Sequence, residues 1–88
     1  MKAKNGFSIK EVAGSFVIVP VGERLVDFSA MITVNDTGAF LWEKIQDDIS
    51  ADALTEALCN EYDVDEDTAK ADVAEFLEVL ISKQVIEE

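Results

Sequence analysis

The chain is short, acidic and rich in apolar residues, which limits what it can be. Its 88 residues suffice for one domain with one core, over residues 1–88, and 49% hydrophobic side chains argue against a disordered chain. The formal net charge is -12, and residues 36–88 carry sixteen acidic but only three basic side chains. Because a nucleic-acid partner requires Lys and Arg to replace phosphate counterions, we expect no nucleic-acid binding.

The sequence shows no N-terminal targeting segment and no membrane-spanning segment. The first residues, MKAKNG (1–6), lead into an alternating strand pattern, and no apolar run approaches the roughly 20 residues of a membrane span. We therefore expect a cytoplasmic protein with no membrane partner. The single cysteine, Cys59, excludes an intrachain disulfide, and its apolar neighbours favour a small buried side chain over a reactive thiol.

Strand patterns occupy residues 7–34. The alternating run FSIK (7–10) is separated by Ala13-Gly14 from the apolar stretch FVIVPV (16–21), which indicates a hairpin. Pro20 is compatible only with an edge strand or the end of a strand. Two further strand patterns are LVDF (25–28) and MITV (31–34). We expect a three- to four-stranded antiparallel sheet.

From Asn35 onward the apolar period becomes helical. Asn35, Ser50 and Asp65 are residue types that cap helix N-termini by accepting a hydrogen bond from the first turn. The predicted helices span residues 36–47, 51–62 and 66–84. The apolar stripe predicted for the third helix is Ala69, Val73, Phe76, Leu77, Leu80 and Ile81. Strands followed by three helices predict an α+β fold in which the sheet packs on a three-helix bundle.

Gly38 falls within the first turn of the first predicted helix. Glycine there destabilises a helix by about 1 kcal/mol relative to alanine. Its presence therefore predicts that another group approaches the helix closely at this point. A phosphate-binding loop is disfavoured because the stretch NDTG (35–38) has a single glycine and no lysine.

No residue pattern predicts catalysis or metal binding. Asp63, Asp65 and Asp67 match the first three ligand positions of a calcium loop, but Thr68 stands where glycine is needed and Ala74 where glutamate is needed. The chain contains no histidine, so Ser-His and Cys-His pairs are excluded. We expect no catalytic residues, no metal site and no cofactor, and hence a protein that is not an enzyme.

The sequence resembles the PqqD-like family over essentially the whole chain. The resemblance rests on VNDTGAFLWEKI (34–45), LTEAL (54–58), EYDVDEDTAKADVAEFLEVL (61–80) and the closing Val85-Ile86, which occur in the family's order. It covers about residues 6–88, and the combination of these pieces is specific although each alone would be weak. Val34 stands where the family usually has leucine, which is a conservative difference.

The resemblance implies a fold and a function. The fold would be winged-helix-like, with three strands packed on three helices. The function would be that of a recognition element for ribosomally synthesised, later modified peptides, as in the synthesis of pyrroloquinoline quinone. Such a module binds the leader of the precursor peptide as an added strand and presents it to a modifying enzyme, often a radical S-adenosylmethionine (radical SAM) protein.

The resemblance also suggests where a leader would bind. The backbone of Met31, Ile32, Thr33 and Val34 would pair with the leader at the edge of the sheet. Side chains of the third helix, Asp72, Phe76, Val79 and Lys83, would form the wall of a groove. Phe76 also fits the core, and Asp72 and Lys83 also fit a solvated surface. The acidic surface would favour leaders that carry Lys or Arg.

Two other functions and one assembly state follow from the same patterns. The order of elements also suits a winged-helix DNA-binding regulator, although the third helix carries more acidic than basic side chains. A structural subunit of a larger enzyme is the other alternative. An unpaired edge strand can also pair with a second copy of the chain, so a homodimer is a further expectation.

Overall fold

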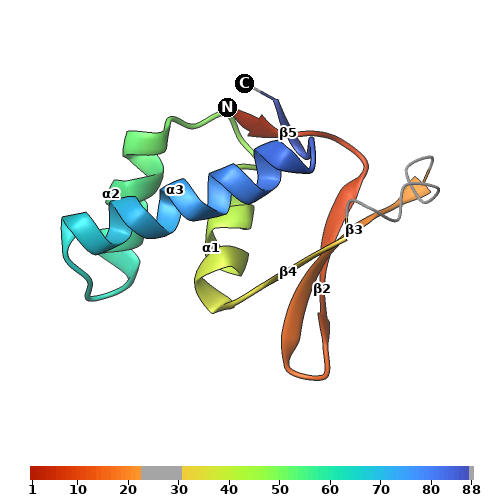
Figure 1. Cartoon of the computed structure of the whole chain (residues 1–88), viewed down its shortest axis with the longest axis horizontal. Coiled ribbons are helices and arrows are strands. Elements are labelled where there is room, and N and C mark those ends of the chain that lie inside the picture. Colours follow the sequence, from red (N-terminus) through yellow and green to blue (C-terminus); the bar gives the residue numbers. More distant parts are fainter. Residues whose placement is uncertain (23–30, 88) are drawn as a thin grey trace.

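The computed structural model describes residues 1–22 and 31–87 and has an α+β fold (Figure 1). In chain order its elements are β1 (Lys2–Ala3), β2 (Phe7–Val12), β3 (Ser15–Pro20), β4 (Ile32–Val34), α1 (Asp36–Lys44), α2 (Ala51–Glu61), α3 (Glu66–Ser82) and β5 (Ile86–Glu87). Strands β2, β3 and β4 form an antiparallel sheet in that order. The prediction of an α+β fold is confirmed. The strand predicted at LVDF (25–28) lies outside the described residues.

The hairpin of β2 and β3 turns at Ala13 and Gly14, as predicted. Both residues have positive φ, 52° and 83°, which is the conformation of a two-residue turn that matches the twist of the flanking strands. Pro20 is the last residue of β3, one of the places where a strand tolerates proline, and among the described residues β4 pairs with β3 from Phe16 to Ile18, short of Pro20.

The first two helices end earlier than their periodicity predicts. Helix α1 ends at Lys44 rather than at residue 47. The Ile45 N–H donates to the Leu41 carbonyl four residues back, whereas the next N–H, of Gln46, donates to the Glu43 carbonyl only three residues back, and the chain then turns. Helix α2 ends at Glu61, and Tyr62 is already extended. The Tyr62 ring packs edge-on against Phe40 of α1, with ring centroids 5.6 Å apart. This contact ties the end of α2 to α1.

Helix α3 also ends early, at Ser82 rather than at residue 84. Gln84 has a φ of 59°, a left-handed conformation that ends the helix and turns the chain into β5. Ile81, which periodicity places in the core, is 49% exposed. The other five residues of the predicted stripe are buried: Ala69, Val73, Phe76, Leu77 and Leu80.

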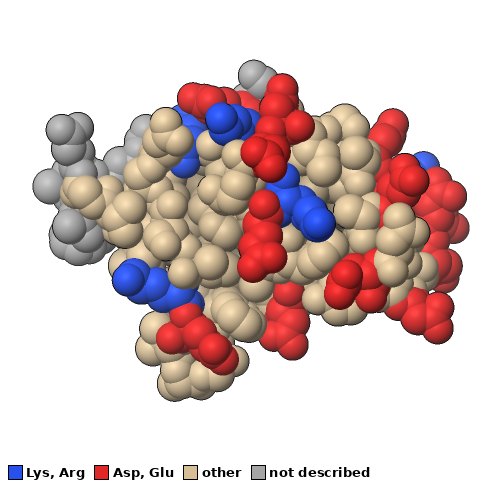
Figure 2. Space-filling model, turned by 180° about the vertical axis from the view of Figure 1, so that it is seen from behind, with Lys and Arg blue, Asp and Glu red and all other residues tan. Residues whose placement is uncertain are grey.

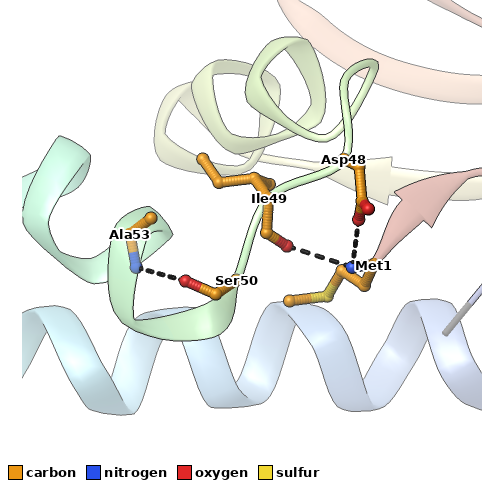
Figure 3. Close-up of polar contacts among 5 residues, drawn as sticks. All are labelled: Met1, Asp48, Ile49, Ser50 and Ala53. Atoms are coloured by element: carbon orange, nitrogen blue, oxygen red, sulfur yellow. Dashed lines mark hydrogen bonds and ion pairs between the residues drawn. The ribbon is translucent and has the colours of Figure 1, made fainter.

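All three predicted N-caps are present. Asn35 Oδ1 accepts a hydrogen bond from Gly38 N at 2.9 Å. Ser50 Oγ accepts one from Ala53 N at 3.1 Å, as Figure 3 shows. Asp65 Oδ1 accepts a hydrogen bond from Thr68 N at 2.7 Å, and this bond lowers the pKa of Asp65 below its ordinary value. Each cap satisfies an N–H that would otherwise lack a partner in the first turn.

The two chain ends form a small second sheet that the sequence patterns do not predict. Strands β1 and β5 pair antiparallel, with Ala3 opposite Ile86. The α-amino group of Met1 donates to Asp48 Oδ1 at 2.6 Å and to the Ile49 carbonyl at 3.2 Å (Figure 3). The N-terminal strand is thereby attached both to β5 and to the connection between α1 and α2.

One apolar core joins these elements. Its most buried side chains come from β3, from the three helices and their ends, and from the residue that precedes β5: Ile18, Leu41, Ile45, Leu54, Leu58, Leu80 and Val85. Cys59 is half-buried against this core, close to the predicted environment. Among the described residues no helix is both long enough and apolar enough to span a bilayer.

Candidate functional site

Strand β4 has one unpaired edge within the described part of the chain. It pairs with β3 through Phe16–Val34, Val17–Thr33 and Ile18–Ile32, and the order β2-β3-β4 leaves its other side open. An open edge exposes backbone N–H and C=O groups that another strand can bond. The position of each group depends on which pairs of the ladder are hydrogen-bonded.

The hydrogen bond from Val21 N to Gly6 O, at 2.8 Å, determines that pattern. Gly6 and Val21 stand opposite each other in the register of β2 and β3, and bonded pairs alternate along an antiparallel ladder. The residues of β3 that bond to β2 are therefore Ser15, Val17 and Val19. Phe16 and Ile18 face the other way and bond to Val34 and Ile32 of β4.

Thr33 is consequently the residue of β4 whose N–H and C=O face the open edge. Ile32 and Val34, on either side of it, direct these groups toward β3. The Ile32 side chain is buried on the core side of the sheet, while Thr33 is exposed. One residue in the middle of β4 therefore presents both a donor and an acceptor to an incoming strand.

A groove of about 200 Å³ lies between β4 and α3. Its lining residues come from β4, from the start of α1 and from α3: Ile32, Thr33, Val34, Asn35, Thr37, Gly38, Leu41, Asp72, Glu75, Phe76, Val79 and Leu80. Leu41, Phe76 and Leu80 are buried and Val79 is 40% exposed, so the groove has an apolar interior. The open edge of the sheet therefore lies along a depression that combines buried apolar side chains with polar ones, rather than on a flat surface.

Two exposed carboxylates stand among the apolar residues of this groove. Asp72 and Glu75 are three residues apart on α3, which places them on neighbouring positions of one helix face. Among the residues that the structure describes, neither carboxylate has a hydrogen-bond or ion-pair partner, and no Lys lines the groove. Figure 2 shows that acidic side chains also gather over the helical side of the molecule. The groove thus lies in a negative field.

Six of the eight residues predicted for peptide binding line this groove. They are Ile32, Thr33, Val34, Asp72, Phe76 and Val79. Met31 precedes β4 and is 50% exposed, and Lys83 is the exposed C-cap of α3; neither lines the groove. Phe76 belongs both to the core and to the groove wall. A binding role for these residues remains a prediction.

Sequence reasoning missed several lining residues for identifiable reasons. Glu75 lies three residues from Asp72 and Leu80 four residues from Phe76, so helical spacing alone could have included both. Thr37 and Leu41 belong to α1, and their place in the groove depends on how α1 packs beside α3. Within the described residues no group of His, Cys, Asp or Glu is arranged to hold a metal ion.

The sequence matches the family described as Coenzyme PQQ synthesis protein D (PqqD) over residues 16–86. This match includes both walls of the groove. The chain belongs to the PqqD family. The resemblance read from the sequence is thereby confirmed.

A solved structure has the same fold as this PqqD-family chain. It is titled "TbiB1 in Complex with the TbiA(beta) Leader Peptide", and it superposes with a TM-score of 0.75 over 99% of this chain and 95% of the other. Sequence identity is 22%, so this likeness concerns the fold. A search of curated proteins found no match.

Proposed function

We propose that this protein binds the leader segment of a ribosomally synthesised precursor peptide as an added strand on β4. The open edge of β4 beside the α3 groove is the observation that supports this most directly. Backbone bonds to an edge strand supply affinity for any extended peptide, and a neighbouring groove selects among side chains. Thr33 would supply the outward N–H and C=O.

The family and the structural neighbour support the same proposal. The neighbour's title describes a protein in complex with a leader peptide, and this chain has the same fold along nearly its whole length. Membership of the PqqD family agrees with a place in the synthesis of a modified peptide. The bound leader would be presented to a separate modifying enzyme, such as a radical SAM protein, with this chain as a non-catalytic, cytoplasmic binding partner.

A DNA-binding role is less compatible with the surface. Helix α3 carries Lys70 as its only basic residue between Glu66 and Ser82, and Lys70 lies 3.7 Å from Glu66. A helix that enters a DNA groove needs basic and amide side chains against the phosphates and base edges. Electrostatic repulsion would oppose such docking at low salt.

Fluorescence anisotropy would test the proposal. The probe is the labelled leader of the short precursor peptide encoded beside this gene, and a labelled DNA duplex is the control. We expect saturable peptide binding of micromolar or tighter affinity and no binding of DNA. Absence of peptide binding, or salt-sensitive binding of DNA instead, would overturn the proposal.

A further inference from the structure

The direction of the backbone groups on β4 determines which side chains of an added strand meet the groove. The residue opposite Thr33 has its side chain on the same face as the Thr33 side chain, because paired residues share a face. Its two neighbours point to the opposite face, where Ile32 is buried and α3 packs. This holds for parallel and antiparallel addition alike. The groove therefore contacts two side chains of the added strand, those directly before and after the residue that pairs with Thr33.

The two ends of the groove differ chemically. Helix α3 and strand β4 run in opposite senses across the molecule (Figure 1), so the earlier part of α3 faces the end of β4 that joins α1. Asp72 and Glu75 belong to that earlier part, whereas Val79 and Leu80 follow one to two turns later. The Val34 end of the groove is therefore acidic, and the Ile32 end is apolar.

The acidic end lacks a positive partner within the described part of the chain. Asp72 and Glu75 are exposed, no described residue forms an ion pair with either of them, and the whole chain carries a net charge of -12. A Lys or Arg on the added strand would supply the missing charge, whereas an acidic side chain would be repelled. The apolar end, where Val79 is half-exposed and Leu80 and Phe76 are buried beside it, favours an apolar side chain over a charged one.

We propose that the groove selects leader segments with one basic and one large apolar residue separated by the residue that pairs with Thr33. This inference rests on the proposed function and specifies its substrate class. The basic side chain lies between Asp72 and Glu75, and the apolar side chain enters beside Val79 and Leu80. Because the acidic end lies at Val34, an antiparallel leader reads basic-x-apolar, and a parallel leader reads apolar-x-basic.

Selection from a library of random 12-residue peptides displayed on phage tests this specificity. The wild-type protein, Glu75→Lys, Asp72→Lys and the control Glu78→Lys are each used as the immobilised target. Glu78 is exposed on α3 and does not line the groove, so its substitution makes the same charge change outside the site. Peptides enriched on the wild type are then made synthetically and measured by fluorescence anisotropy.

We expect the wild type and Glu78→Lys to enrich peptides with a basic residue two positions from a large apolar one, in a single order. Replacing that basic residue by Gln should weaken binding by about three- to fivefold, and by Glu by about tenfold. Glu75→Lys and Asp72→Lys should lose the preference for a basic residue, and the peptide carrying Glu should recover affinity for them.

The other outcomes separate this inference from the proposed function. Enriched peptides that lose affinity for Thr33→Pro but show no preferred charge would overturn the specificity and leave strand addition intact. If Glu78→Lys changes the charge preference as much as Glu75→Lys and Asp72→Lys do, the preference comes from the net charge of the protein. That result would also overturn the specificity. If no peptide is enriched, or if binding is unaffected by Thr33→Pro, both the proposed function and the specificity are wrong.

Discussion

Gly38 of α1 lies directly against the side chain of Val34 of β4. A Cβ atom at position 38 would stand 2.7 Å from Cβ of Val34, and 3.3 and 3.4 Å from its two Cγ atoms. Only three residues lie between these positions, so the chain must reverse tightly from the strand into the helix that Asn35 caps. This contact explains the glycine in the first turn of α1 and sets the position of the edge strand.

Gly38→Ala should therefore destabilise the protein, although alanine favours helix. The gain in helix propensity is about 1 kcal/mol, whereas forcing a methyl group into a packed contact costs about 1–3 kcal/mol. We expect a net loss of about 1 kcal/mol in the free energy of unfolding, measured by urea denaturation. Glu43→Ala, at an exposed position of α1, is the control and should change stability by less than about 0.5 kcal/mol. A more stable Gly38→Ala would contradict the contact.

Thr33→Pro should weaken leader binding more than it weakens the fold. The Thr33 N–H faces the open edge, so its removal takes a donor from the incoming strand and none from the β3–β4 ladder. We expect a loss of about tenfold in peptide affinity, the equivalent of one to two backbone hydrogen bonds. Anisotropy and urea denaturation measure the two effects separately.

Val34→Pro is the matched control for Thr33→Pro. Its N–H belongs to the bonded pair with Phe16, so the substitution should destabilise the sheet itself. If the two variants lose stability and affinity in the same proportion, the edge assignment of Thr33 is wrong.

The contact between Met1 and Asp48 should make stability depend on pH. The hydrogen bond from the α-amino group, reinforced by its charge, lowers the pKa of Asp48 below its ordinary value of 3.8. A carboxyl with a lowered pKa in the folded state stabilises the fold above its unfolded pKa, and this contribution is lost as the pH falls through the folded pKa. Asp48→Asn should be less stable than the wild type at pH 7.

The difference between wild type and Asp48→Asn should disappear as the pH falls below the folded pKa of Asp48. Urea denaturation at a series of pH values from neutral to strongly acidic measures it. Asp47→Asn removes a neighbouring exposed carboxylate that forms no ion pair with any of the described residues, and it should leave stability at pH 7 nearly unchanged. A difference that persists undiminished in acid would exclude the ion pair as its cause.

The open edge of β4 should also allow two copies of the chain to pair. We expect light scattering after size-exclusion chromatography to show a mass that rises with concentration from 9.7 kDa toward twice that value. Both Thr33→Pro and an excess of leader peptide should lower this mass. The substitution blocks the edge at which two copies would pair, and the peptide occupies it. A mass of 9.7 kDa at every concentration would exclude the homodimer.

Local patterns predict most of the main elements. The hairpin turn at Ala13-Gly14, the caps at Asn35, Ser50 and Asp65 and the run MITV (31–34) are set by neighbouring residues, and the structure has each of them close to the predicted place. Strands β1 and β5 were missed because two residues carry no periodicity. Their pairing depends on the two chain ends meeting in the folded protein.

The candidate site was predictable only in part. Asp72, Phe76 and Val79 follow from the helical period of α3, and all three line the groove. Helical spacing also places Lys83 on this stripe, but Lys83 lies beyond the last helical residue, Ser82, and does not line the groove. The outward direction of Thr33 could not be predicted, because it depends on which pairs of the β2–β3 ladder are bonded.

An NMR titration of isotopically labelled protein with the leader peptide tests the central claim most directly. Strand addition on β4 predicts amide shifts confined to β4 and the groove-facing side of α3, with the Thr33 amide becoming protected from solvent exchange. A DNA duplex should produce no shifts. Shifts that leave Thr33 and Phe76 unchanged, or a response to DNA in place of peptide, would contradict the account.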